Sequence, residues 1–177
     1  MHWLRPKEGE YLPYQYTYLS RVPDGDLLAM FAQQVQETVN LYASLTSTQL
    51  AYAYAEGKWT VQEVLQHIID CERVMTYRAM RFARKDTTPL PGFDENLYVE
   101  TSGAMQRSIE DMTSEFQTLR AATIAFFKSC TTEMLQASGM ANGGNFTVNA
   151  YAWILVGHEL HHMAILQERY GIPAVTG

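Results

Sequence analysis

Apolar residues recur along this chain at the spacing of amphipathic helices, in four long segments. The predicted helices run from Asp24 or Asp26 to residues 50–54, from Thr60 to near Arg84, from residues 101–105 to about Phe127, and from Thr147 or Asn149 to Tyr170. Thr60 with Glu63 three residues later forms a capping-box pattern, and Gly171 followed by Pro173 is a helix stop signal.

The segments that connect these helices lack the long amphipathic pattern. Residues 85–99 contain Pro89 and Pro91, which discourage helix, so this stretch is predicted to be a loop. Residues 131–137 predict a short helix, and the glycines that follow predict a flexible connection. No segment predicts a β-strand.

Four amphipathic helices without strands or repeats predict an all-α fold, an antiparallel four-helix bundle. The chain of 177 residues is expected to form a single domain over residues 1–177. Residues 1–23, rich in proline and tyrosine, are expected to form an irregular arm laid over the core.

Composition narrows the function classes. Thirteen Lys and Arg against 19 Asp and Glu give a net charge of −6 without a basic stripe, so nucleic-acid binding is not expected. No apolar run has the length of a membrane span, and no signal peptide begins the chain. Cys71 and Cys130 lie in apolar helical patterns, which predicts two buried free thiols in a reducing cytoplasm.

The run from Gly157 to His162 places three of the five histidines within five residues of the last helix. His158 and His162 are four residues apart, so both side chains project from one helix face. Such a pair can supply two of the three protein ligands of a catalytic zinc-type site.

A third imidazole is available from the second helix. His67 lies three residues after Val64 and four before Cys71, within the buried stripe. Three inward-facing imidazoles from two helices of one bundle are expected to converge, since burying them without a partner is costly. We therefore predict a divalent metal bound by His67, His158 and His162.

Neighbouring polar residues are weaker candidates. His161 lies about 60° from His158 and about 100° from His162 around the helix axis, so it could orient a ligand or line the pocket. Glu63 and Asp70 flank His67 and could fix its tautomer, although Glu63 could be taken up by the helix cap. For both carboxylates a structural role remains open.

The sequence from His158 to His162 also satisfies the HExxH pattern of zinc proteases, with Glu159 as general base. Only 15 residues follow His162, and none of them is a histidine. No strand is predicted that could bind an extended peptide. These observations count against a protease.

Two motifs together resemble one known family, and the resemblance covers most of the chain. They are Lys58-Trp59-Thr60-x-x-Glu63-Val64-x-x-His67-Ile68-x-Asp70 and Gly157-His158-Glu159-x-His161-His162. They closely resemble the DinB-like superfamily of metal-binding four-helix bundles, which includes bacterial thiol S-transferases and proteins assigned as metal-dependent hydrolases. The resemblance implies His67, His158 and His162 as ligands, zinc or nickel as the metal, and no DNA binding.

The leading hypothesis is an enzyme whose metal activates a water molecule or a thiol for attack on a small-molecule substrate. Water as nucleophile makes it a hydrolase, and a low-molecular-weight thiol cosubstrate makes it a detoxifying S-transferase. A non-catalytic metal-binding stress protein and a bundle without metal are the alternatives. A homodimer formed through an apolar helix face is also compatible with the sequence.

Overall fold

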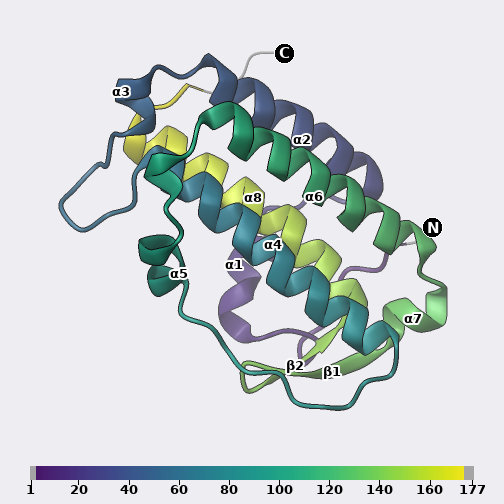
Figure 1. Cartoon of the computed structure of the whole chain (residues 1–177). Coiled ribbons are helices and arrows are strands. Elements are labelled where there is room, and N and C mark those ends of the chain that lie inside the picture. The colour runs from purple at the N-terminus through teal and green to yellow at the C-terminus, as the bar shows by residue number, and fades with distance from the viewer. Residues whose placement is uncertain (1–2, 174–177) are drawn as a thin grey trace.

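A computed structural model describes residues 3–173, in which long helices pack as a bundle (Figure 1). The long helices are α2 (Leu27–Ser44), α4 (Val61–Ala83), α6 (Ile109–Ser129) and α8 (Val148–Tyr170). Helices α2 and α4 each pack against both α6 and α8, so α2 and α4 lie diagonally across the bundle. The predicted four-helix bundle is confirmed.

The antiparallel arrangement expected from the sequence holds for only half of the contacts between long helices, because each long helix has one antiparallel and one parallel neighbour. The end of α4 lies beside the start of α8, and the same relation holds between α2 and α6 (Figure 1). Gln62 and Thr76 of α4, in contrast, lie beside Met112 and Thr123 of α6 in the same chain order. The α4–α6 connection, residues 84–108, returns along the bundle and makes this parallel pairing possible.

Side-chain caps fix where the long helices begin. Asp26 accepts a hydrogen bond from the Leu28 backbone, and Thr60 with Glu63 forms the predicted capping box. Thr147 accepts from the Ala150 backbone at the start of α8. These caps satisfy backbone N–H groups that lack partners within the first helical turn.

Three boundaries differ from the sequence prediction. Helix α2 stops at Ser44, because Thr46 and Gln49 form a second capping box that starts the separate short helix α3 (Ser47–Leu50). The predicted loop over residues 85–99 is helical from Glu95, where α5 (Glu95–Thr101) begins, and the 3₁₀ helix η2 (Ala104–Gln106) follows. Ser108 then caps α6, so that helix begins later than predicted.

The prediction that the chain has no strand is wrong. After the predicted short helix, now α7 (Thr132–Gln136), β1 (Ser138–Ala141) and β2 (Gly144–Thr147) pair as an antiparallel hairpin. Asn142 and Gly143 at the turn both have positive φ, 49° and 76°, as a type I′ turn requires. The Asn-Gly dipeptide was the hairpin signal, and the prediction treated these glycines only as a flexible connection.

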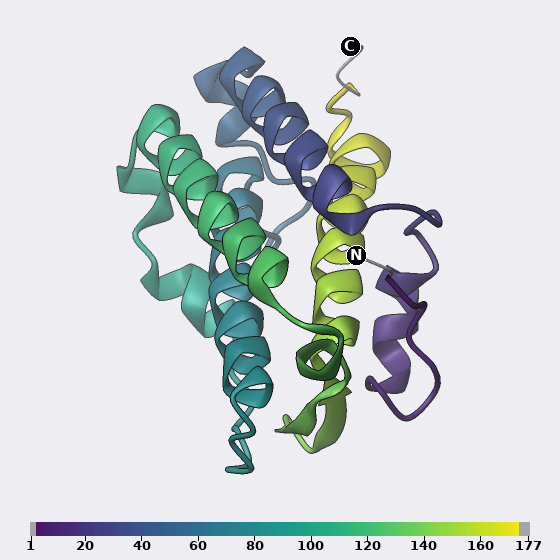
Figure 2. The same ribbon diagram turned by 90° about the vertical axis from the view of Figure 1, so that its right-hand side faces the viewer.

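The N-terminal arm contains more helix than expected. The 3₁₀ helix η1 (Pro13–Gln15) leads into α1 (Tyr16–Leu19), which packs against α8 (Figure 2). Gly157 permits this close approach, because a Cβ atom built there would lie 2.3 Å from the backbone oxygen of Tyr18. No helix within residues 3–173 is long and apolar enough to cross a membrane.

Replacing Gly157 by alanine should therefore destabilise the protein. Replacing glycine by alanine stabilises an isolated helix by up to about 1 kcal/mol. Here the added methyl group would be packed against a backbone atom, and such overpacking costs about 1–3 kcal/mol. We expect a net loss in the free energy of unfolding measured by urea denaturation. A variant more stable than the wild type would show that α1 does not contact α8 as described.

Candidate metal centre

Three imidazoles converge where α4 faces α8. The Nε2 atom of His158 lies 3.0 Å from that of His67 and 3.1 Å from that of His162. All three residues are buried, with exposed fractions of 7%, 3% and 8% for His67, His158 and His162. The structure thus brings together the three histidines that the sequence singled out.

Burial keeps these rings neutral. Loss of solvation, reinforced by neighbouring His161, lowers the pKa of His67 to about 4. Burial is also the main cause that lowers the pKa of His158 and of His162 well below the ordinary value, and the adjacent imidazoles lower it further. Neutral imidazole is the form that binds a metal ion, so at neutral pH the three nitrogens are ready as ligands.

The arrangement fits a metal ion. A neutral imidazole nitrogen is either an N–H donor or an acceptor, so the Nε2 atom of His158 needs a partner of the opposite kind in both His67 and His162, whereas one metal ion would accept all three lone pairs. Nitrogens bound tetrahedrally at about 2.0–2.1 Å from one ion are about 3.3 Å apart. The observed separations of 3.0 and 3.1 Å are within a few tenths of an ångström of that value.

A cysteine that the sequence did not connect with the site lies beside it. The Sγ atom of Cys71 is 3.6 Å from both ring nitrogens of His67, and Cys71 is 3% exposed. Donor atoms of His67, Cys71 and His158 all lie within 4.8 Å of one another. The predicted buried free thiol is confirmed, and its i,i+4 spacing from His67 was the signal that could have placed it here.

Aromatic residues enclose the imidazoles. The Trp59 ring lies 4.6 Å from the His67 ring, and Tyr18 of the N-terminal arm contacts His158 edge-to-face at 5.3 Å. The arm therefore covers one side of the site. A hollow of about 220 Å³ opens beside His162.

The hollow beside His162 carries positive charge and aromatic surface. Lys58 and Arg169 line it together with Tyr54, Trp59 and Tyr170. It is large enough for a small molecule, and its two cations would attract a negatively charged group. Of the three imidazoles, His162 lines this hollow, so a ligand in it would lie next to the His162 ring.

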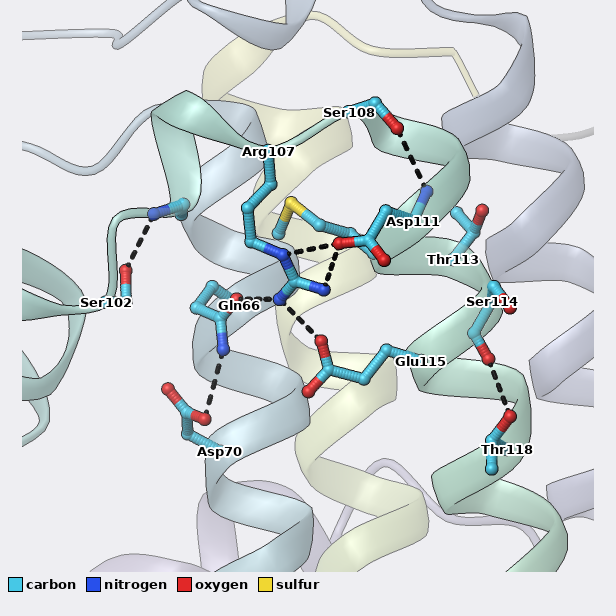
Figure 3. Close-up of polar contacts among 12 residues, drawn as sticks. Gln66, Asp70, Ser102, Arg107, Ser108, Asp111, Thr113, Ser114, Glu115 and Thr118 are labelled. Atoms are coloured by element: carbon cyan, nitrogen blue, oxygen red, sulfur yellow. Dashed lines mark hydrogen bonds and ion pairs between the residues drawn. The ribbon is translucent and has the colours of Figure 1, made fainter.

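The two carboxylates that flank His67 in sequence face elsewhere. Glu63 accepts hydrogen bonds from the backbone and hydroxyl of Thr60 in the capping box. Asp70 accepts from Gln66, whose side-chain oxygen accepts from Arg107 on the side of α4 that faces α6 (Figure 3). Neither carboxylate hydrogen-bonds an imidazole within the described part of the chain.

Glu159 belongs to a buried ion-pair cluster that links all four long helices. Its carboxylate accepts from Arg120 Nη2 at 2.6 Å and from the Thr38 hydroxyl at 2.6 Å. Arg120 also donates to Glu72, at 2.8–3.1 Å. With both oxygens of Glu159 engaged, the geometry favours a structural role over that of a general base.

Arg120 and its ion pairs were not predicted from the sequence. Burial raises the pKa of Glu159, against the opposing effect of Arg120. A charged residue inside an apolar helical stripe, as Arg120 is among Phe116, Thr123 and Phe127, was the available signal. Such a residue is almost never fully buried unless paired.

His161 stands apart from the converging nitrogens. It is half-buried, its ring lies 5.2 Å from that of Tyr18, and its Nδ1 atom has no hydrogen-bond partner within residues 3–173. Burial lowers its pKa, with smaller effects from Arg21 and Arg169. The ring lines the edge of the site next to the N-terminal arm.

Known proteins resemble this chain in sequence and in fold. A protein of Oceanobacillus iheyensis named "Putative metal-dependent hydrolase" is 30% identical over 145 residues, 76% of each chain. YfiT from Bacillus subtilis, described as having an unusual four-helix bundle topology, matches at a TM-score of 0.68 and 20% identity, covering 96% of this chain and 95% of its own. A mycothiol-dependent maleylpyruvate isomerase matches at a TM-score of 0.66 and 12% identity, covering 89% of this chain and 64% of its own.

The match to a family model covers most of the bundle. The model of the DinB superfamily matches residues 30–166, a range that contains His67, His158 and His162. Together with the relative at 30% identity, this match decides the family. The chain belongs to the DinB superfamily.

Proposed function

We propose that this protein is a metal-dependent hydrolase of small molecules, with a divalent ion held by His67, His158 and His162. The proposal rests on three buried, neutral imidazoles. The Nε2 atom of His158 lies 3.0 Å from that of His67 and 3.1 Å from that of His162. The name of the Oceanobacillus protein and the description of YfiT both refer to metal-dependent hydrolases. Zinc or nickel suits an imidazole donor set.

A bound divalent ion supplies Lewis acidity, which polarises a carbonyl or phosphoryl oxygen and makes water nucleophilic at neutral pH. The residues of the chain hold and orient the reactants. Lys58 and Arg169 in the hollow beside His162 would attract an anionic part of the substrate, and Trp59 would pack against its apolar part. Tyr18, packed on His158, keeps water out from the side of the N-terminal arm.

A second candidate is transfer of a low-molecular-weight thiol to an electrophile. It is favoured by the fold shared with a mycothiol-dependent enzyme, at a TM-score of 0.66. The same imidazoles would serve, with a thiol in place of water as nucleophile. The cations of the hollow would then hold a carboxylate of the thiol cosubstrate.

The decisive assay compares turnover with and without a thiol. Untagged protein loaded with zinc or nickel is offered ester, amide and phosphoester substrates, and separately electrophiles with a small thiol. We expect hydrolysis without thiol, its loss in His67→Ala, and a raised KM for anionic substrates in Arg169→Ala. Arg73→Ala, on the side of α4 that faces α6, is the matched control.

The other two outcomes of this assay would each indicate a different function. Turnover that requires the thiol would replace hydrolysis by S-transfer. Loaded protein that turns over neither class would leave a non-catalytic metal-binding protein. Partners, a homodimer and a cytoplasmic location remain predictions from the sequence.

A further inference from the structure

A pocket of about 560 Å³ lies between the second half of α4 and the loop that follows that helix. Its walls carry three arginines and three aromatic rings, which are Arg73, Arg78, Arg81, Tyr77, Phe93 and Tyr98. Within the described part of the chain, no acidic residue lines this pocket. Pockets for small molecules have volumes of about 300–1,000 Å³. The volume and the lining therefore suit a small molecule that has an apolar body and a negative charge.

One of the three arginines is buried without a counter-charge. Arg73 and Arg81 each pair with a carboxylate. Arg78 belongs to none of the ion pairs among residues 3–173, although it is only 7% exposed. An arginine is almost never buried unless it is paired, and the second buried arginine, Arg120, has two carboxylate partners. The site at Arg78 thus lacks the anion that its environment calls for.

The guanidinium of Arg78 is held in place and still has free donors. Its Nη2 atom donates to the Pro91 carbonyl at 2.6 Å, and its Cζ atom lies 5.6 Å from the centre of the Phe93 ring. A guanidinium has five N–H donors. The bond to Pro91 uses one of them, and even with the neighbouring Tyr151 hydroxyl as a second partner three remain. Binding a carboxylate through two parallel hydrogen bonds requires only two.

The loop wall of the pocket is fixed to the β-hairpin. The Leu90 N–H group donates to the Met140 carbonyl at 2.9 Å, and the Leu90 carbonyl accepts from the Asn142 N–H group at 3.0 Å. The loop therefore runs along the hairpin with a short parallel pairing (Figure 1). The opposite wall is the long helix α4. A pocket whose walls are fixed in this way costs little conformational entropy on binding.

We propose that this pocket binds a small aromatic carboxylate. The carboxylate accepts two parallel hydrogen bonds from Arg78, and the ring packs against Phe93 and Tyr98. Arg78 follows His67 by eleven residues in α4, about 16 Å along the helix axis. A ligand of this size in the pocket does not reach the imidazoles. The pocket is therefore a second binding site, separate from the proposed metal centre.

Isothermal titration calorimetry with the whole, zinc-loaded chain tests the site with three probes: benzoate, its uncharged analogue benzamide, and acetate. We expect the wild type to bind benzoate and to bind the other two at least about tenfold more weakly, since benzamide lacks the charge and acetate lacks the ring.

Two variants test the position of the site. Arg78→Met keeps the side-chain stem and removes the charge, and Val74→Trp fills the pocket from α4 while Arg78 stays in place. Each should weaken benzoate binding by about tenfold or more. Arg169→Ala removes a cation from the hollow beside His162, and His67→Ala removes a proposed metal ligand. Both of these controls should bind benzoate as tightly as the wild type.

The outcomes separate this inference from the proposed function. Absence of benzoate binding at millimolar concentration, equally tight binding of benzamide, or full affinity in Val74→Trp would overturn it. Loss of benzoate binding in His67→Ala would place the carboxylate at the metal ion instead of at Arg78. If Arg78→Met does not fold, Val74→Trp decides alone. If the wild type binds no zinc, the metal centre fails, whereas the benzoate result still decides this inference.

Discussion

Replacing Arg120 by methionine should lower the free energy of unfolding by about 3–5 kcal/mol, the cost of breaking a buried ion pair. Arg120 and its partners Glu72 and Glu159 have side-chain exposures of only 1–2%. Methionine fills much of the same volume but leaves two carboxylates in the core without a cation. The uncompensated charge, rather than lost packing, is the dominant expected cost.

The position of Arg120 explains why replacing it should destabilise the whole bundle. Its guanidinium binds carboxylates from α4 and α8 and lies over the ring of Phe31 in α2, 5.0 Å from the centroid. Thr38 of α2 completes the cluster by donating to Glu159. All four long helices therefore meet at this one side chain.

Urea denaturation of wild type and Arg120→Met measures the effect. Arg73→Met is the control, because Arg73 pairs with Glu115 at the surface with 46% of its side chain exposed. An exposed pair contributes about 0–1 kcal/mol. Equal losses in the two variants would contradict a special role for the buried cluster.

Zinc added to the metal-free protein should raise the free energy of unfolding, by about 4 kcal/mol at a free concentration of 1,000 times Kd. His158→Ala should abolish this gain, because its Nε2 is the atom that contacts both other imidazoles. His161→Ala should retain it. That histidine is on the same helix, but its ring lies 5.2 Å from that of Tyr18, next to the N-terminal arm, and its Nδ1 atom has no hydrogen-bond partner within residues 3–173.

Thermal or urea unfolding at matched free zinc concentrations gives both results. A gain that disappears in His161→Ala but survives in His158→Ala would move the site to the face next to the N-terminal arm. An equal gain in all three proteins would indicate that zinc binds elsewhere.

Helical periodicity and capping chemistry predicted much of this molecule from sequence. The stripe containing His67 and the i,i+4 pair His158 and His162 were sufficient to bring three imidazoles together. The prediction succeeded because the apolar faces of helices in a bundle pack into one common core. Thr60 with Glu63 located the start of α4 for a purely local reason.

Contacts between distant segments were not predictable in the same way. The pairing of Arg120 with Glu72 and Glu159 depends on α6 running parallel to α4, which the long connection decides and local patterns do not. Cys71 looked like an ordinary core thiol until the approach of α8 placed His158 beside it. The hairpin, in contrast, has a local signal in the positive-φ preference of Asn142-Gly143.

Metal content is the most direct test of the central claim. Elemental mass spectrometry is applied to untagged wild type and His67→Ala, each after loading with zinc or nickel and removal of free ion. The account predicts one divalent ion per chain in the wild type and its loss in His67→Ala, since that variant removes the ligand from α4. Metal retained by His67→Ala, or absent from the loaded wild type, would contradict a centre shared by α4 and α8.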